Sequence, residues 1–123
     1  MVLFASPGDA EAALRRLDEA DVARCLAQRV RGQTRNLEGQ EVRIYDSSAR
    51  PLSFPAFGDR SAASQVRAEV EFEGGTASAY LDFVLVQKGR TLAILLFFSV
   101  VSPFSAAEKE ALTATVVQRI GSD

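Results

Sequence analysis

Residues 65–101 read QVRAEVEFEGGTASAYLDFVLVQKGRTLAILLFFSVV, and this segment predicts two consecutive β-hairpins. From residue 65 to residue 73 apolar and polar residues alternate, which is the period of a half-buried strand. Gly74 and Gly75 follow, and they supply the positive φ angles of a two-residue hairpin turn. The pattern therefore predicts an antiparallel pair of strands with one buried face.

The register expected for this hairpin pairs Glu73 with Thr76, because apolar side chains then meet apolar side chains on one face of the two strands. On the opposite face the same register places Arg67 across from Asp82, so we expect a cross-strand ion pair between them. The alternative is a functional role for Asp82. It interrupts an apolar strand, and burial of its carboxylate would suit it to act as an acid or base.

The second hairpin is expected to turn at Lys88 and Gly89, and a three-residue loop with Gly89 at a bulge is the alternative. The strand that follows, residues 92–98, is apolar on both faces. A strand of this kind lies centrally in a sheet and is covered on both sides. The residues expected in the core are therefore Leu81, Phe83, Leu85, Ile94, Leu96, Leu112 and Val116.

Helical segments are predicted at both ends of the chain. A helix capped by Ser6 is expected to break near residues 18–21 and to resume to about Arg31. Ser105 opens the capping box S-A-A-E of a helix that runs to about Ile120. Two helical units around a central antiparallel sheet predict an α+β fold in which helices cover both faces of the sheet, a three-layer α/β/α sandwich.

Two segments are expected to be irregular: residues 32–40 as a polar loop, and residues 47–63 as a long connection rich in Pro, Ser, Gly and Ala. Phe54 and Phe57 lie in the second segment. Aromatic residues in such a loop either hold it on the core or line a binding surface. The binding hypothesis predicts that the most accessible large apolar side chains lie between Pro51 and Phe57.

The length of 123 residues suits a single domain, residues 1–123. A formal net charge of -2 and the absence of a basic stretch argue against a nucleic-acid partner. The apolar run of residues 92–101 is too short to span a bilayer as a helix, and no secretory signal is visible at the N-terminus. Cys25, the only cysteine, cannot form an internal disulfide and is expected on the buried side of a helix.

The chain contains no histidine, which excludes the nucleophile arrangements that use histidine as a base, and it has no phosphate-loop or dinucleotide motif. We therefore expect no catalytic residues, no metal site and no cofactor. The first function expected is non-catalytic binding of a small apolar ligand or a protein partner. Two alternatives are a small-molecule enzyme that uses the carboxylates of Asp82, Glu69 and Glu71, and a structural homodimer that associates through an exposed sheet face or edge.

Several short motifs resemble those of one group of proteins. They are G-D-R-S-A-A at residues 58–63, the G-G turn, Y-L-D-F-V-L-V at residues 80–86, G-R at residues 89–90, and the capped last helix. The opening F-A-S-P-G-D-A-E-A-A-L, followed by V-A-R-C-L, is similar as well. Together these motifs resemble small extracytoplasmic actinobacterial proteins with a PsbP-like fold, among them LpqN-type lipoproteins and the sensor domains of some receptor kinases.

The resemblance implies a three-layer α/β/α sandwich and a non-enzymatic role in binding or sensing at the bacterial cell envelope. It provides no catalytic residues to carry over. Proteins of that group usually have a secretion or lipoprotein signal and often contain further cysteines, whereas this sequence shows neither. Two alternatives follow: the chain is part of a longer precursor that carries the signal, or it is a cytosolic relative. The location stays open, although the resemblance implies an extracytoplasmic one.

Overall fold

The computed structural model describes residues 1–37 and 39–120. Within these residues six strands form one antiparallel sheet, in the order β1-β6-β5-β4-β3-β2. In chain order the elements are β1 (Val2–Leu3), α1 (Pro7–Ala20), α2 (Val22–Val30), β2 (Thr34–Leu37), β3 (Gln40–Pro51), β4 (Arg60–Phe72), β5 (Gly75–Lys88), β6 (Thr91–Val100) and α3 (Ala106–Arg119). The predicted α+β class and the antiparallel sheet are confirmed.

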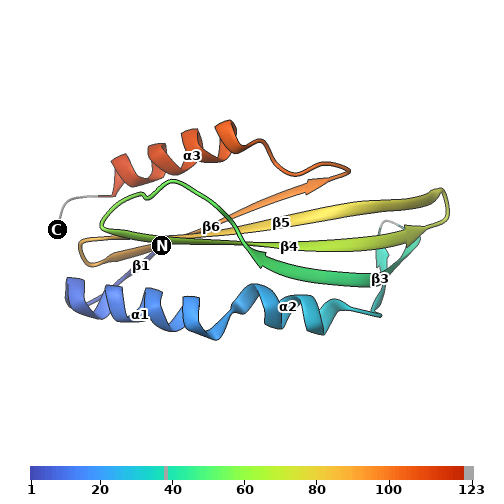
Figure 1. The fold of residues 1–123 in the computed structure, drawn as a ribbon, viewed down its shortest axis with the longest axis horizontal. Helices are drawn as coiled ribbons and strands as arrows, with labels where there is room; N and C mark the ends of the chain where they lie inside the picture. Colours follow the sequence, from blue (N-terminus) through green and yellow to red (C-terminus); the bar gives the residue numbers. More distant parts are fainter. Residues whose placement is uncertain (38, 121–123) are drawn as a thin grey trace.

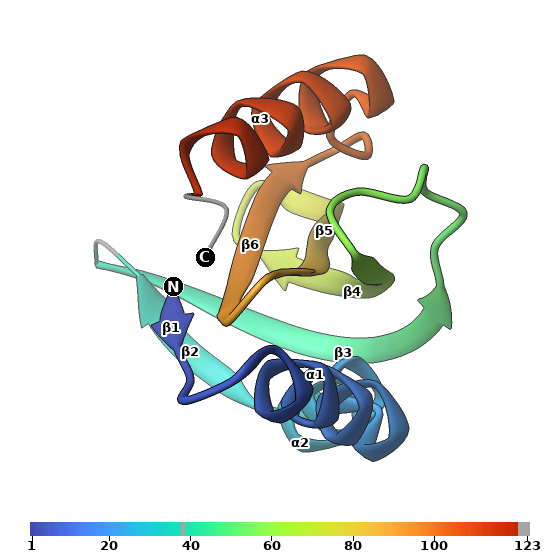
Figure 2. The same ribbon diagram turned by 90° about the vertical axis from the view of Figure 1, so that its left-hand side faces the viewer.

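The helices are placed by their contacts with the sheet. Figure 1 shows α1 and α2 end to end along one side of the sheet and α3 along the other, and Figure 2 shows the same arrangement from the end. Ala23 and Ala27 of α2 pack against Val66 of β4. Lys109 of α3 instead reaches Asp82, whose side chain points away from α2. In Figure 1, α3 lies over the half of the sheet nearest the β5–β6 turn, and the β4–β5 hairpin extends beyond it.

The break between α1 and α2 lies at Asp21, within the segment where the sequence predicts it. The Ser6 hydroxyl caps α1 by accepting a hydrogen bond from the backbone N–H of Asp9 at 3.2 Å. Asp21 has a φ of +50°, and its carboxylate accepts a bond from the N–H of Arg24 at 3.3 Å. The left-handed residue therefore ends one helix and caps the next, which explains why the apolar pattern loses phase here.

The β4–β5 hairpin forms, but its turn lies one residue earlier than predicted. Phe72 pairs with Gly75, so the two loop residues are Glu73 and Gly74, and Gly75 has a φ of +136°. In the observed register each β4 residue faces a β5 residue two positions earlier than predicted. Side chains alternate between the two faces from one residue to the next, so a shift of two positions leaves every side chain on its predicted face. Both registers fit the apolar alternation equally well, so the alternation does not distinguish between them.

The change of register separates Arg67 from Asp82. Arg67 lies opposite Tyr80, and Asp82 lies opposite Gln65. The Asp82 carboxylate accepts its hydrogen bonds from Gln65 and Lys109. The predicted ion pair between Arg67 and Asp82 is therefore wrong.

The β5–β6 hairpin, in contrast, turns one residue later than the predicted two-residue turn at Lys88 and Gly89. Lys88 is the last residue of β5 and pairs with Thr91, which leaves Gly89 and Arg90 as the two loop residues. Gly89 has a φ of +56°, as a tight hairpin turn requires. Lysine is thus not placed at positive φ, and no bulge is needed.

The segments predicted as irregular contain more strand than expected. Residues 32–40 include β2, which pairs with the start of β3, and β3 itself continues to Pro51. With β4 beginning at Arg60, the long connection shrinks to residues 52–59. β2 reads TRNL, which has neither alternation nor β-branched apolar residues, so a short polar edge strand of this kind leaves no pattern to find.

The 52–59 connection is held against β5 at Gly58. Gly58 has a φ of +62°, and a Cβ added there would lie 2.6 Å from the backbone oxygen of Gln87 and 2.9 Å from Cγ1 of Val86. The next residue, Asp59, donates its N–H to the same Gln87 oxygen at 2.8 Å. No side chain fits between the connection and the strand.

Replacing Gly58 by Ala is therefore expected to lower the free energy of unfolding by more than about 1–2 kcal/mol, the cost of the left-handed conformation alone. The matched control is Gly8→Ala in the first turn of α1, where a Cβ would meet only the Ser6 hydroxyl oxygen, at 3.8 Å. Urea unfolding measures both variants. Equal stability of the two would show that the connection does not contact β5 as described.

The buried residues form two clusters on opposite faces of the sheet. On the α3 side, Val84, Val86 and Phe97 form a core that Phe104 and Val117 extend. On the other side, the α2 alanines pack on β4 and β5. The predicted core is only partly correct, because Ile94, Leu96 and Leu112 are exposed, whereas Leu81, Phe83, Leu85 and Val116 are half-buried.

The error comes from the position of β6. Within the described residues its neighbour on the outer side is β1, which pairs only with Thr91 and Leu92. On the face opposite α3, α1 packs over β5 and β6 and α2 over β3 and β4. The exposure of Ile94 and Leu96 shows that these helices leave the later part of β6 uncovered on that face. The prediction of a central strand covered on both sides is wrong.

Cys25 is exposed, contrary to the prediction that it faces the core. The buried residues of α2 are Ala23 and Ala27, and Cys25 lies midway between them, so it points to the opposite side of the helix. Its sulfur lies 3.7 Å from the backbone oxygen of Ala20.

Candidate functional site

The aromatic pair of the 52–59 connection is not an exposed surface. Phe54 and Phe57 are half-buried, their ring centroids lie 5.6 Å apart, and both rings pack against the core on the α3 side. Neither is among the exposed large apolar residues, many of which lie on β6. The prediction that residues 51–57 carry the most accessible apolar side chains is wrong. The two rings hold the connection on the core.

A polar site lies instead on the α3 side of β3, β4 and β5. Two cross-strand rows of side chains form it. The first row is Ser48, Arg67 and Tyr80, and the second is Arg50, Gln65 and Asp82. These residues border a hollow of about 280 Å³, which is lined by Ser48, Arg50, Gln65, Arg67, Tyr80 and Pro103. We refer to it as the arginine hollow.

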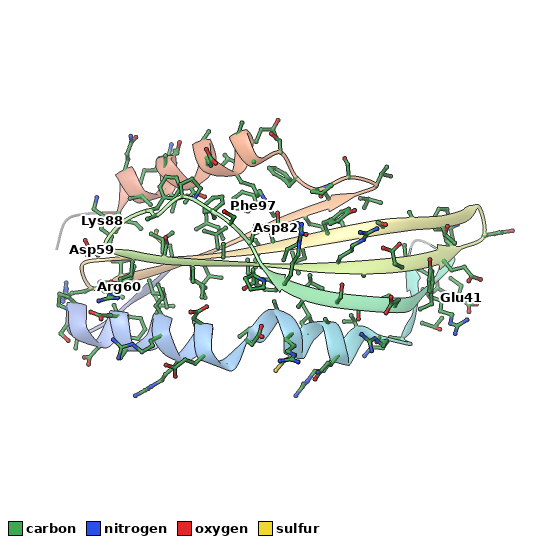
Figure 3. All side chains as sticks on the ribbon, viewed as in Figure 1. Glu41, Asp59, Arg60, Asp82, Lys88 and Phe97 are labelled. Atoms are coloured by element: carbon green, nitrogen blue, oxygen red, sulfur yellow. The ribbon has the colours of Figure 1, made fainter. Side chains whose placement is uncertain are left out.

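Behind the arginine hollow lies a buried ion pair. The side chain of Asp82 is fully buried and that of Lys109 is 5% exposed, and Lys109 Nζ donates to Asp82 Oδ2 at 2.5 Å. The other carboxylate oxygen, Oδ1, accepts from Gln65 Nε2 at 2.8 Å. Figure 3 shows Asp82 in the middle of the sheet, beside Phe97 and below α3. Both oxygens of this carboxylate are therefore satisfied inside the fold.

The hydrogen bonds continue from this pair to Arg50. Gln65 Oε1 accepts from Arg50 Nε at 3.1 Å, so the amide is held at both ends. Its orientation is thereby fixed, and the amide in turn positions the guanidinium. Within residues 1–37 and 39–120, Arg50 takes part in no ion pair. It contributes an uncompensated positive charge to the hollow.

The guanidinium of Arg67 is held by contacts with Glu69 and with the ring of Tyr80. Its Nε donates to Glu69 Oε1 at 2.7 Å, and its central carbon lies 5.6 Å from the centroid of the Tyr80 ring. The bond to Glu69 raises the pKa of Arg67 above its ordinary value. The pKa of Glu69 is lowered, first by the hydrogen bond from the Ser78 hydroxyl and also by the hydrogen bond and positive charge of Arg67. Arg67 is therefore a fixed cation at all physiological pH values.

The carboxylates proposed for the enzymatic alternative do not converge. Asp82 is bound by Lys109 and Gln65, whereas Glu69 is bound by Arg67 and Ser78. Glu71 lies farther along β4 and lines a separate hollow near Glu41 and Glu73, at the end of the sheet where Figure 3 labels Glu41. The described residues include no group of three or more His, Cys, Asp or Glu side chains that could hold a metal ion.

The sequence interpretation missed most of the arginine hollow. Arg50 precedes a proline in a segment predicted as a loop, so no strand face could be assigned to it. Lys109 lies between two glutamates and looks like a solvent-exposed residue. One signal was present: Lys109 lies four residues before Thr113 and eleven before Ile120, both buried, which places it on the inner stripe of α3.

A second hollow, of about 240 Å³, lies on the opposite side of the sheet. Most of its lining is apolar and comes from the α1–α2 junction and from β4 to β6; the large apolar members are Leu17, Val22, Phe83, Leu85, Ile94 and Leu96. We call it the apolar groove. Its lining has the apolar chemistry that the expected small apolar ligand would need.

No protein-family model, curated protein or solved structure matches the chain. No helix in the described part of the chain is both long and apolar enough to cross a membrane.

Proposed function

We propose that this chain is a non-catalytic binding domain whose ligand is a small anion, carboxylate or phosphate, held in the arginine hollow. The observation that carries the proposal is Arg50. Arg50 lines the same hollow as Arg67, and its guanidinium is oriented through Gln65 by a buried ion pair. Burying an ion pair costs desolvation energy, so the pair contributes little net stability. A role in positioning a binding residue would explain why it is present.

The chemistry of the lining supports an anion. Arginine binds carboxylate and phosphate through two parallel N–H bonds, and such charge-assisted bonds are about twice as strong as neutral ones. Gln65 accepts from Arg50 Nε, which leaves the terminal nitrogens of that guanidinium for a ligand. Ser48 and Tyr80 add hydroxyl groups to the lining. Pro103 lies two residues before Ser105, the N-cap of α3, whose dipole also favours negative charge nearby.

The three-layer α/β/α arrangement of the PsbP-like group is part of this proposal. It is supported by the packing of α2 against one side of the sheet and the contact of α3 with the other. A sensing or binding role at the cell envelope rests on the motif resemblance described above. The absence of histidine and the capture of the Asp82 carboxylate inside the fold support a non-catalytic role.

The test is calorimetric titration of the purified chain with phosphate and, separately, with citrate. Arg50→Gln is expected to weaken binding by roughly ten-fold or more, because a hydrogen bond to a charged group contributes about 1.5–3 kcal/mol. Arg24→Gln is the matched control, since Arg24 is an exposed arginine on α2 and its loss changes the net charge equally. Equal weakening in both variants, or no binding of either anion by the unmodified chain, would contradict the proposal.

A further inference from the structure

The outer edge of β6 is open along most of its length. β1 pairs with β6 only at Thr91 and Leu92, and in the described part of the chain no other strand lies on that side. The rest of β6, up to Val100, therefore presents backbone N–H and C=O groups without a strand partner. Such an edge is a template for another strand.

The direction of the backbone groups identifies which residues form this template. The Arg90 carbonyl accepts from the N–H of Phe4, on the β1 side, and the N–H of Val101 donates to the Ser78 carbonyl, on the β5 side. Backbone groups alternate between the two sides along an antiparallel strand. The residues between Thr91 and Val101 whose groups point outward are consequently Leu92, Ile94, Leu96, Phe98 and Val100.

Four of these residues also carry exposed apolar side chains. Their side chains lie on the face opposite α3, and the exposed fractions are 46% for Ile94, 58% for Leu96, 63% for Phe98 and 50% for Val100. Natural edge strands are protected by charged residues, proline or bulges, and β6, which reads TLAILLFFSV, has none of these. The open edge and the open apolar face coincide in the same residues.

We infer that β6 pairs with β6 of a second copy of this chain, antiparallel about a twofold axis, so that two sheets join into one. The outward backbone groups of Ile94, Leu96, Phe98 and Val100, which β1 does not reach, then meet an identical strand. With the axis at Phe97, Ile94 faces Val100 and Leu96 faces Phe98 across the interface, so apolar side chains meet throughout.

A second copy fits this edge because the strand is self-complementary. A twofold contact uses the same patch on both partners. Like charges placed opposite each other would oppose such pairing, and β6 contains no charged residue. A strongly charged partner strand would find no group of opposite sign on β6. Ile94 and Leu96 also line the apolar groove, so the second copy would extend one wall of that groove.

Pairing at β6 does not depend on the proposed anion binding. The arginine hollow is formed by β3, β4 and β5 on the α3 side, whereas the exposed β6 side chains lie on the other face. Loss of anion binding and loss of the dimer can therefore be observed separately.

The first experiment measures molar mass by light scattering after size exclusion, over a range of chain concentrations. The unmodified chain is expected to be a dimer, and the double variant Leu96→Lys, Phe98→Lys is expected to be monomeric with unchanged circular dichroism. The control, Tyr45→Lys with Leu112→Lys, adds the same charge at two exposed apolar residues outside β6 and should stay dimeric. A monomeric unmodified chain, a dimeric β6 variant, or equal loss in the control would overturn the inference.

The second experiment needs no variant and decides the question if the lysine substitutions prevent folding. Hydrogen exchange by NMR is recorded on the unmodified chain at low and high concentration. The amides of Leu96 and Phe98 point outward from β6, so they are expected to gain protection as the concentration rises, whereas that of Leu95 points to β5 and should be protected throughout. Fast exchange at Leu96 and Phe98 at every concentration would overturn the inference. Protection of both amides that does not change with concentration in a monomer would overturn it as well.

Discussion

Replacing Lys109 by Met is expected to lower the free energy of unfolding by about 3–5 kcal/mol, because it leaves a buried carboxylate without its cation. The Asp82 side chain is fully buried, and its second partner, Gln65, is a neutral amide that cannot compensate the charge. Methionine has a similar length to lysine and keeps the apolar contacts of the side-chain stem, so the loss reports the charge and not a cavity. Urea or thermal unfolding at neutral pH measures the change.

The chain supplies its own control for this result, because Lys88 is the only other lysine. Lys88 is half-buried, and its Nζ donates to the backbone oxygen of Val117 at 3.2 Å. Lys88→Met is expected to cost about 0.5–1.5 kcal/mol, the usual contribution of one hydrogen bond. A similar small loss for Lys109→Met would show that water reaches Asp82.

A double variant separates stability from positioning. Asp82→Leu with Lys109→Met removes both charges at once, and such replacements of a buried pair are often neutral or stabilising. Much of the stability lost in Lys109→Met should therefore return. Gln65 then loses its anchor in Asp82, so anion binding through Arg50 should stay weak. Recovery of both stability and binding would contradict a positioning role for the pair.

The local parts of the fold could be predicted because their signals lie within a few residues. Ser6 caps the first helix, Asp21 marks the break, and Ser105 with Glu108 opens the last helix. The β4–β5 hairpin could be located in the same way from its alternation and its glycines. The exact register could not, because a shift that keeps every side chain on its face leaves the apolar pattern unchanged.

The site depended on information that no local pattern carries. Arg50 and Arg67 are brought together by the pairing of β3 with β4, two strands joined by a connection whose bounds the sequence did not reveal. Lys109 meets Asp82 only because α3 packs over β5. The position of β6 in the sheet could not be predicted for the same reason. A strand that is apolar on both faces indicates that both faces are covered, but its sequence does not distinguish cover by a helix from cover by another molecule.

Replacing Leu92 by Ala is expected to cost about 2–5 kcal/mol, since the cavity adds to the lost transfer energy. Leu92 is 2% exposed, at the start of β6, where α1 packs over the strand. The matched control is Leu96→Ala, on the same face of the same strand but 58% exposed, and its cost should stay within about 0.5 kcal/mol of zero when unfolding is measured on the monomer. A loss of several kcal/mol at Leu96 in dilute monomer would show that another part of the chain covers β6. A small loss at Leu92 would show that α1 does not pack there.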